Sequence, residues 1–427
     1  MYSRSSTVTI GEHRGSPRLY LEGKWIGKVG FEPGNNIRVD FLTNKVTIVP
    51  DNEGDRTVSG KKKRTIPIID INCQELEEIF NGADNVQVVA GNNEITITPA
   101  YTATLQATRI LAPTEASMFS GGGMLSLAAK QSGFEPKVAI EINSKYAEIF
   151  ETNHPSAHMY NMSASEVPYG ELQRFRPIGL FTAGIPCEPF TNVRRLDRGG
   201  QVKRDKSLVP EAHELGDMVF WTLRNIEALN PHTIILEEVP AFLESGAGQI
   251  LLHVLKRLYK YVEYKTINSL DYGSLTGRKR AVIVAQDIPI NWPAEVSLDR
   301  SLGEIFDPEP HDWFDKNTKA WLFDHWEKQT AKGNGFASQS YTEDSPYVGT
   351  ITKRYFAQQG GNPVIAHPEK EGVFRWLTLN EVKRLHGLPA DYYLGTSKTG
   401  AGEVMGQGVV VDTFQRIIES VTEGVLV

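Results

Sequence analysis

The sequence is poor in cysteine. Cys73 and Cys187 are the only two cysteines among its 427 residues. Two thiols exclude a framework of several disulfides and a zinc site built from four cysteines, and we expect no metal centre. Because a free thiol in a reducing compartment is either inert packing or a reactive group, each cysteine can be interpreted from its own surroundings.

Long apolar runs are also missing. No stretch reaches the roughly 18 apolar residues that span a bilayer. The opening segment, MYSRSSTVTIGEHRGS, lacks the apolar core of a secretory signal. We therefore expect a cytoplasmic protein without a membrane partner.

An excess of positive charge is absent as well. The formal net charge is −7, which excludes a uniformly basic nucleic-acid coat but leaves room for a local basic groove. Hydrophobic residues make up 40% and charged residues 23% of the chain, as in ordinary globular proteins. This length and composition predict two or three domains with real hydrophobic cores.

The first hundred residues alternate apolar and polar residues in short segments, the pattern of β-strands. Such segments lie at 8–10, 18–23, 37–42 and 45–50 and, after a polar stretch at 51–64, at 65–71, 86–90 and 94–99, with a helix at 74–80. Interpreting the polar stretch as a linker, we predict a small β domain at 1–55 and a small α+β unit at 65–105. We recognise no internal repeat.

The pattern then changes to apolar runs that alternate with helical segments. Continuous apolar strands separated by helices predict βαβ units and a parallel sheet buried on both faces, so the fold class is α/β. This pattern holds over residues 112–285. Residues 286–372, rich in Trp, Asp, Pro and Gly, predict an irregular insert, and helical periodicity resumes in residues 373–427.

A glycine-rich turn follows the first of these later strands. Phe119-Ser120-Gly121-Gly122-Gly123 lies between an apolar strand and a helix, where glycine lets a ligand approach the backbone and the helix N-terminus favours negative groups. Glu141 ends the next strand, the usual place of an acid that binds ribose hydroxyls. The pattern indicates a nucleoside-bearing cofactor, although Ser126 stands where a third glycine is usual. The alternative is a tight turn with a surface glutamate.

Two other strand ends carry chemically active side chains. Cys187 follows Gly184-Ile185-Pro186 at the edge where α/β sheets bind ligands. This position favours a reactive thiol at Cys187. The alternative is a buried structural thiol, which is the interpretation that we prefer for Cys73. Glu237 and Glu238 end the strand at 233–239, and because neighbouring strand residues point to opposite faces, one of them is expected in the site. The alternative interpretation is that both glutamates lie at a solvated strand end without a role in catalysis.

Two arginines precede the strand at 281–285. Arg278 and Arg280 are two residues apart, so they can share one face of the strand and point at the same cleft. The alternative is a positively charged edge that discourages strand pairing.

Together, these four motifs resemble the DNA (cytosine-5) methyltransferases over residues 112–427. The resemblance continues in Arg375-x-Leu377-Thr378-x-x-Glu381 and in Gly406-x-x-Val409. It implies a Rossmann-like, S-adenosylmethionine-dependent catalytic domain at 112–285, a target-recognition domain at 286–372, and C-terminal motifs at 373–427 that return to the catalytic domain. It also implies S-adenosylmethionine as cofactor, double-stranded DNA as partner, and a prokaryotic, phage or mobile-element origin.

The resemblance further implies a set of site residues. The catalytic residues are Cys187, Glu237, Arg278 and Arg280. The cofactor-binding residues are Phe119, Ser120, Gly121, Gly122, Gly123, Met124, Glu141, Ile142, Asn161, Met162, Gly184, Pro186, Gln407 and Val409. The residues contacting DNA are Thr191, Arg194, Arg195 and Arg198, in a basic segment that resembles the family's mobile loop.

The family's chemistry implies a covalent route, because cytosine C5 is a weak nucleophile. The thiolate of Cys187 adds to C6 and turns the ring into an enamine that attacks a methyl sulfonium. Glu237 stabilises the adduct at N3 and at the exocyclic amine, and the arginines hold the base and a phosphate. The target nucleotide must leave the base stack for this to happen.

Several positions depart from the family pattern, namely Asn161, Glu188, Glu238, Thr276 and Gln407. Extra carboxylates beside a thiol disfavour the thiolate, because like charges repel. We interpret the chain as an active cytosine-5 methyltransferase. Two alternatives stay open: a related enzyme that makes a non-standard C5-pyrimidine modification, and a catalytically inactive DNA-binding regulator.

Residues 7–50 resemble the AbrB-type swapped-hairpin β domain. The resemblance is carried by Arg18-Leu19-x-Leu21-x-Gly23-Lys24-Trp25, by Gly30-Phe31-x-Pro33-Gly34 and by Val46-x-Ile48. It implies a homodimer formed through the N-terminal domain, and DNA binding by that domain. A plain spacer or dimerisation module is the alternative.

Overall fold

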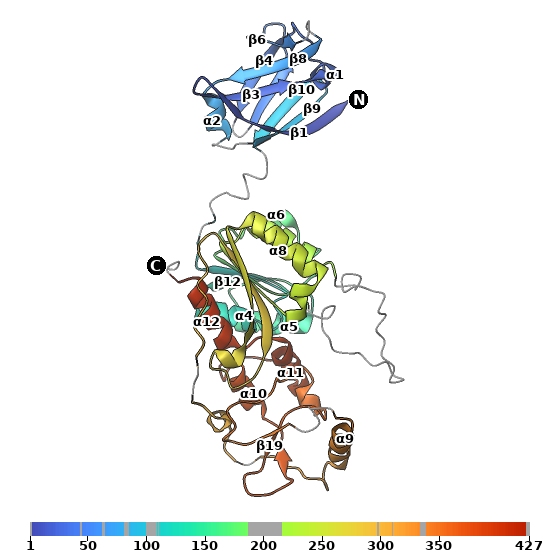
Figure 1. The fold of residues 1–427 in the computed structure, drawn as a ribbon, viewed down its shortest axis with the longest axis vertical. Coiled ribbons are helices and arrows are strands. Elements are labelled where there is room, and N and C mark those ends of the chain that lie inside the picture. Colours follow the sequence, from blue (N-terminus) through green and yellow to red (C-terminus); the bar gives the residue numbers. More distant parts are fainter. Residues whose placement is uncertain are drawn as a thin grey trace. The chain divides into compact units, whose positions relative to one another are not determined.

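The computed structural model describes residues 2–42, 45–61, 65–80, 85–99, 109, 111–186, 216–296, 299–309, 311–333 and 339–423. The chain forms two compact units, Met1–Thr108 and Arg109–Val427 (Figure 1). Within the described ranges, no helix combines the length and the apolar character needed to cross a membrane.

The larger unit is built on a seven-stranded sheet. Its strands run in the order β13 (His158–Tyr160), β12 (Glu135–Ile140), β11 (Thr114–Met118), β14 (Leu180–Gly184), β15 (Thr233–Glu238), β17 (Lys279–Gln286) and β16 (Tyr261–Asn268). The first five strands are parallel. Every residue of β15 is buried, as expected for a central strand that is covered on both faces.

The expected parallel sheet contains one antiparallel strand. β17 runs antiparallel to both of its neighbours, β15 and β16. The cause is the short connection between β16 and β17, whose only regular element is the 3-10 helix η3 (Ser269–Asp271). A parallel neighbour needs a crossover of about a dozen residues or more, so the chain turns back and β17 enters the sheet between β15 and β16.

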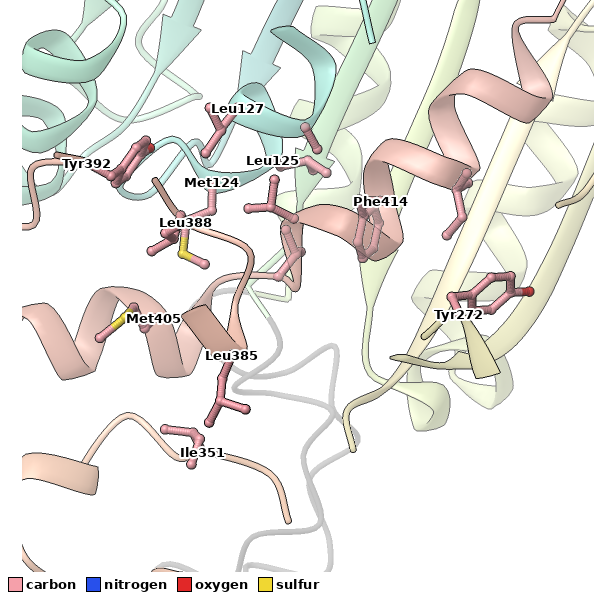
Figure 2. Packing of buried hydrophobic residues seen from close by; sticks show 14 of the residues in the cluster. Met124, Leu125, Leu127, Tyr272, Ile351, Leu385, Leu388, Tyr392, Met405 and Phe414 are labelled. Carbon is pink, nitrogen blue, oxygen red and sulfur yellow. The ribbon is translucent and has the colours of Figure 1, made fainter. Parts of the chain in front are cut away.

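Helices cover both faces of this sheet (Figure 1). One face carries α4 (Met124–Gln131), α5 (Ser144–Asn153) and α12 (Val411–Val421), and the other carries α6 (Tyr169–Gln173), α7 (Met218–Leu229) and α8 (Gly246–Leu258). α12 packs directly on α4, and Phe414 lies in the same buried cluster as Leu125 (Figure 2). The last described helix therefore returns to the helix that follows the glycine-rich turn.

Residues 286–372 contain few regular elements, as the sequence predicted. They hold η4 (Leu302–Ile305), α9 (Ala320–Ala331), η5 (Tyr355–Ala357), β18 (Ser340–Tyr341) and β19 (Val364–Ala366), and β19 pairs with β20 (Phe374–Arg375). Phe314, Leu322 and Trp326 form a small core of this segment. Ile351 instead joins the main cluster, beside α10 (Leu379–Leu385) and α11 (Lys398–Gln407) (Figure 2).

The smaller unit contains two β-sheets around one hydrophobic core. Six strands run in the order β1 (Ser3–Thr9), β9 (Asn85–Gly91), β10 (Glu94–Pro99), β5 (Lys45–Pro50), β4 (Asn36–Leu42) and β6 (Arg56–Thr57). Four run in the order β2 (Gly11–His13), β3 (Ser16–Glu22), β8 (Ile66–Asn72) and β7 (Ser59–Lys61). Two short helices, α1 (Lys24–Lys28) and α2 (Glu75–Phe80), complete the unit.

The predicted division of this region into units at 1–55 and 65–105 is wrong. β3 pairs with β8, and β5 pairs with β10. The core also draws on both segments, from Leu19 to Ile97. Neither segment closes its sheets or its core alone, so the two segments fold as one unit.

This unit is an internal duplication, and the prediction of no internal repeat is wrong. The elements β1, β2, β3, α1, β4 and β5 are followed by β6, β7, β8, α2, β9 and β10, which take equivalent places in the two sheets. Phe31 and Phe80, like Ile48 and Ile97, are buried equivalents 49 residues apart. The copies share the positions of apolar residues more than residue identities, which is why the repeat is hard to see in the sequence.

The pairing of strands shows that an approximate two-fold axis relates the two copies. Tyr20 pairs with Asp70, its own equivalent 50 residues later, and Thr47 pairs with Thr96, its own equivalent 49 residues later. A residue can pair with its own equivalent only beside a two-fold axis. Each copy also gives its first strand to the other, since β1 pairs with β9 and β6 pairs with β4.

Candidate active site

The parallel strands β12, β11, β14 and β15 end at one edge of the sheet, where α/β proteins bind ligands. The glycine-rich turn follows β11, and Phe119, Gly121 and Gly123 have positive φ angles of 51°, 53° and 84°. Glycine adopts this conformation without strain, whereas at Phe119 it marks a backbone held in place by its surroundings. Both the amide and the hydroxyl of Ser120 lie 3.2 Å from the carbonyl oxygen of Ile140, to which they donate. The turn is thereby tied to the end of β12.

Side chains pack closely against this turn. A Cβ atom at Gly123 would lie 2.7 Å from Nε2 of His154, and one at Gly122 would collide with Val404. His154 Nε2 lies 3.0 Å from the carbonyl oxygen of Gly123, and burial lowers the pKa of His154 to about 4, so the ring is neutral near pH 7. The hydroxyl of Tyr392 donates to the carbonyl of Gly122 at 2.7 Å. His154 and Tyr392 thus hold the turn, and the sequence motifs pointed to neither.

Glu141 faces the turn from the end of β12. Its carboxylate accepts the N–H groups of Gly121 and Asn143, each at 2.8 Å, and burial raises its pKa. The next side chain, Ile142, is 67% exposed, although it is apolar. Backbone N–H groups, a carboxylate suited to ribose hydroxyls and an exposed apolar surface suited to a purine ring fit a nucleoside-bearing cofactor.

Two departures from the family pattern support this edge of the site. The amide nitrogen of Asn161 donates to the carbonyl of Glu141 at 2.8 Å, and its amide oxygen accepts from Ser144 at 2.9 Å. Gln407 accepts from the hydroxyl of Tyr146 at 3.0 Å and so links the end of α11 to α5. Two other predicted cofactor-binding residues, Met162 and Val409, pack against or within the hydrophobic clusters. Met124, at the start of α4, is buried as well.

A buried polar network lies beneath the turn. Glu115 on β11 is fully buried, and its Oε1 accepts from Ser126 at 3.0 Å and from Thr182 at 2.5 Å. Burial raises the pKa of Glu115 to about 7, and its Oε2 has no hydrogen-bond partner among the described residues. Ser126, which replaces the third glycine of the usual motif, thus joins α4 to β11, and Thr182 joins both to β14. In the sequence, the one sign of this network is an acidic residue, Glu115, inside an apolar strand.

Glu237 and Arg280 form an ion pair at the end of β15. Both side chains are largely buried, and Glu237 pairs in the sheet with Gly184 of β14. The carboxylate of Glu237 lies 3.4 Å from the position that a Cβ atom at Gly184 would take. Two of the predicted catalytic side chains therefore meet beside the strand that leads to Pro186, the last described residue before Cys187.

Glu238 points away from Glu237 and is a neutral acid. It is 1% exposed. One oxygen accepts the N–H of Val239 at 2.6 Å, and the other has no hydrogen-bond partner in the described part of the chain. Burial, with the neighbouring charge of Glu237 in a smaller role, raises the pKa of Glu238 to about 9. The residue that replaces the family's asparagine thus adds no negative charge near pH 7.

The two predicted arginines contact different partners. Arg280 contacts Glu237, whereas Arg278 is 4% exposed and donates to the carbonyl of Gly406 at 3.0 Å. Arg278 therefore links the start of β17 to the end of α11. The hydroxyl of Thr276, which replaces the family's glutamine, donates to the carbonyl of Gly349 at 3.3 Å and anchors the insert.

Several predicted residues lie outside the described residues. They are Cys187, Glu188, Thr191, Arg194, Arg195 and Arg198. The other cysteine, Cys73, packs against the core of the smaller unit, and burial raises its pKa, which disfavours the reactive thiolate. In the described ranges, no group of three or more His, Cys, Asp and Glu side chains is arranged to hold a metal ion.

The fold is Rossmann-like and similar to that of solved methyltransferases, and the turn with Glu141 fits a nucleoside-bearing cofactor. The sequence profile of the C-5 cytosine-specific DNA methylase family matches residues 114–423, and the chain belongs to this family. It is a DNA (cytosine-5)-methyltransferase that uses S-adenosylmethionine as methyl donor. The smaller unit lies outside the family match.

The chain is similar to curated type II methyltransferases in sequence and to solved methyltransferases in fold. The type II methyltransferase M.DsaV of Dactylococcopsis salina is 24% identical over 317 residues, which cover 71% of this chain and 84% of the relative. M.NlaX of Neisseria lactamica is 24% identical over 313 residues, which cover 71% of this chain and 94% of the relative. The fold is similar to that of the Dnmt2 methyltransferase of S. pombe, with a TM-score of 0.57, 18% identity, and coverage of 74% of this chain and all of that one. The Entamoeba histolytica methyltransferase EhMeth has a TM-score of 0.57 at 17% identity, with coverage of 73% of this chain and 98% of that one.

Proposed function

We propose that the chain methylates C5 of a cytosine flipped out of double-stranded DNA, through a covalent adduct between Sγ of Cys187 and C6 of the base. The observation that carries this proposal is the ion pair of Glu237 and Arg280 beside Gly184. A carboxyl group and a guanidinium there can bind the polar edge of a pyrimidine. Gly184 precedes the thiol of Cys187 by three residues in the sequence.

The reaction requires a balanced sequence of bond changes. The thiolate forms a bond to C6, and the ring electrons move toward N3 and C5, so that N3 takes up a proton and C5 becomes nucleophilic. S-adenosylmethionine supplies the methyl group as a sulfonium. Transfer of the methyl group to C5 would break its bond to the sulfonium sulfur, which would leave as a neutral thioether. A base, such as a water molecule, then takes the C5 proton as the thiolate departs from C6, and N3 returns its proton to Glu237, which restores the aromatic ring.

Glu237 and Arg280 act on the base in this scheme. One oxygen of Glu237 accepts a hydrogen bond from the exocyclic amine, and the other carries the proton that reaches N3. Arg280 orients the carboxyl group through their ion pair and offers N–H donors to O2 of the ring. Both side chains are largely withdrawn from water, which strengthens these interactions relative to those at an open surface.

The cofactor would be held by the turn at 119–124 together with Glu141, Ile142 and Asn161. Glu141 and Ile142 present the carboxylate and the exposed apolar surface described above, and Asn161 fixes the backbone that carries them. Gly184, Pro186, Met162, Gln407 and Val409 are the remaining predicted members of this set. Arg278 is proposed to act indirectly, by holding the segment that ends at Gln407.

The neutral state of Glu238 supports an active enzyme. A second carboxylate near the thiol would oppose thiolate formation and repel phosphate. Because burial keeps Glu238 protonated near pH 7, this departure adds no such charge. The proposal therefore favours the active methyltransferase over a catalytically inactive DNA-binding regulator.

The test uses DNA that contains 5-fluorocytosine together with S-adenosylmethionine. Fluorine at C5 cannot leave as a proton, so the wild-type enzyme is expected to accumulate a covalent complex that survives denaturing electrophoresis. Cys187→Ala should form none and should lose methyl transfer to ordinary DNA, whereas Cys73→Ala is the matched control and should retain both.

The outcomes separate the alternatives. Full methyl transfer by Cys187→Ala would refute the covalent mechanism. Duplex binding without any adduct in the wild type would indicate the inactive regulator. Nucleoside mass spectrometry of the treated DNA would reveal a non-standard modification, if 5-methylcytosine is absent and another C5 product is present.

A further inference from the structure

The smaller unit needs no second chain to complete its fold. The exchange of first strands between β1 and β9 and between β6 and β4 takes place within one chain. The hydrophobic core is likewise formed from both copies of the duplicated motif. The strand exchange that the resemblance to swapped-hairpin domains placed in a homodimer is therefore present within one chain, and the homodimer itself stays a prediction.

Duplication within one chain lets the two halves differ, and they differ in charge. Over the whole copies, residues 3–50 contain seven basic and four acidic residues, and residues 56–99 contain five basic and six acidic residues. From β3 onward the contrast is sharper, with five basic and three acidic residues at 17–50 against six acidic and no basic residues at 66–99. The contrast is clearest in the helices, where Lys28 of α1 corresponds to Glu78 of α2, 50 residues later. In a homodimer of identical chains the two halves would carry the same charge, whereas here the first half is more basic than the second.

A cluster of cations and aromatic rings lies on the basic half. We call Tyr2, Arg4, Lys24, Trp25 and Lys28 the basic patch. The guanidinium carbon of Arg4 lies 5.2 Å from the centroid of the Trp25 ring, and Nζ of Lys28 lies 5.2 Å from that of Tyr2. These contacts place the start of β1 beside α1.

The cations of the basic patch are available to a partner. Arg4, Lys24 and Lys28 are exposed, and none of them forms an ion pair with another residue that the structure describes. Three other basic residues of this unit are paired, Arg18 with Asp70, Arg38 with Asp51 and Lys61 with Glu22. One acidic group, the carboxylate of Glu32, lies close to Gly27 in α1, so the patch is a local site rather than a uniformly basic face.

We propose that the basic patch binds the phosphate backbone of double-stranded DNA and adds to the contacts made by the larger unit. The inference rests on the proposed function, in which duplex DNA is the substrate. Unpaired cations on a unit of an otherwise acidic chain match a polyanion, and the aromatic rings hold the cations in place through cation–π contacts. Duplex DNA, the proposed substrate of the larger unit, is such a polyanion.

The experiment compares the full-length wild type with Arg4→Gln/Lys24→Gln/Lys28→Gln. Duplex DNA labelled with a fluorophore is titrated at several salt concentrations, and the affinity is read from anisotropy. Each lost phosphate contact removes about 0.9 from the slope of log affinity against log salt. We therefore expect the slope to fall by about two to three, and the affinity at about 0.1 M salt to fall on the order of tenfold or more.

The matched control places the change on the other half. Glu77→Gln/Glu78→Gln alters the equivalent helix α2 and should leave the salt slope unchanged or the binding slightly stronger. Lys24→Gln/Lys28→Gln, which leaves β1 intact, should show an intermediate loss. If both variants that lose Lys24 and Lys28 kept the wild-type salt slope and the wild-type thermal unfolding, the proposal would be overturned.

Failure of this inference is distinguishable from failure of the proposed function. Cys187→Ala should keep the full salt slope, since the basic patch is intact, while losing methyl transfer. If Cys187→Ala kept methyl transfer, the covalent mechanism would fail, and the comparison of wild type with the patch variants would still decide whether the smaller unit binds DNA.

Discussion

Replacing Glu115 by glutamine is expected to change how the stability of the larger unit depends on pH. The carboxyl group of Glu115 is fully buried, where it accepts from Ser126 and Thr182. Burial raises its pKa from 4.5 to about 7. Because the folded-state pKa lies above the unfolded value, the neutral carboxyl stabilises the fold fully below about pH 4.5, and this contribution is lost as the pH rises to about 7.

The size of the effect follows from the shift. At about 1.4 kcal/mol for each pKa unit, the wild type loses about 3 kcal/mol over this range through Glu115. Glutamine cannot ionise, and its carbonyl can still accept from Ser126 and Thr182. Its NH2 group falls where Oε2 has no partner among the described residues, which costs about 1–3 kcal/mol at every pH. The free-energy difference between variant and wild type should therefore shift by about 2–3 kcal/mol in favour of the variant between pH 5 and pH 8.5.

The assay is denaturant unfolding of the full-length chain at several pH values, followed by tryptophan fluorescence. Six of the seven tryptophans belong to the larger unit: Trp221, Trp292, Trp313, Trp321, Trp326 and Trp376. Other buried groups, such as His154, titrate in both proteins and cancel in the difference. Glu151→Gln, at an exposed position on α5, is the control for loss of a surface carboxylate.

One result would refute this reasoning. If the stability difference between Glu115→Gln and wild type stays constant to within about 0.5 kcal/mol from pH 5 to pH 8.5, Glu115 does not take up a proton in the folded state as its burial requires. A shift of the same size in Glu151→Gln would likewise assign the effect to surface charge.

Two further predictions concern the catalytic carboxyls and the duplicated unit. Glu237→Gln should lower kcat by about 10²- to 10⁴-fold, because it removes the proton carrier and weakens the pair with Arg280. The kcat of Glu238→Gln should stay within about threefold of the wild-type value at pH 7, because Glu238 is already neutral there. Equal losses in a methyl-transfer assay would contradict the different roles of these two residues. In solution, light scattering should give the mass of a single chain, 47.6 kDa, because the strand exchange closes within the chain; a dimer that persists at low micromolar concentration and disappears when residues 1–108 are deleted would show that the unit pairs with a second copy instead.

Local patterns in the sequence determined much of the catalytic unit. The glycine-rich turn at 119–123, the acid at Glu141 and the carboxyl at Glu237 all sit at ends of strands that apolar runs predict, because strand periodicity and turn chemistry depend on neighbouring residues. The family signature depends on the same local features. The sequence also predicted that regular elements become sparse after residue 286, and the elements described there are few.

The tertiary structure decided the features that depend on distant residues. The antiparallel β17 follows from the pairing of β16 and β17 across a short connection, and the closed pseudo-dimer follows from register pairs such as Tyr20 with Asp70. Ionisation belongs to this group as well. Glu238 stays protonated at pH 7, and Glu115 is protonated in part, because elements from several parts of the chain remove water from them, and no local pattern specifies that burial. The sequence by itself determined which groups stand at the active edge of the sheet, and only the three-dimensional packing decided which of those groups carry charge.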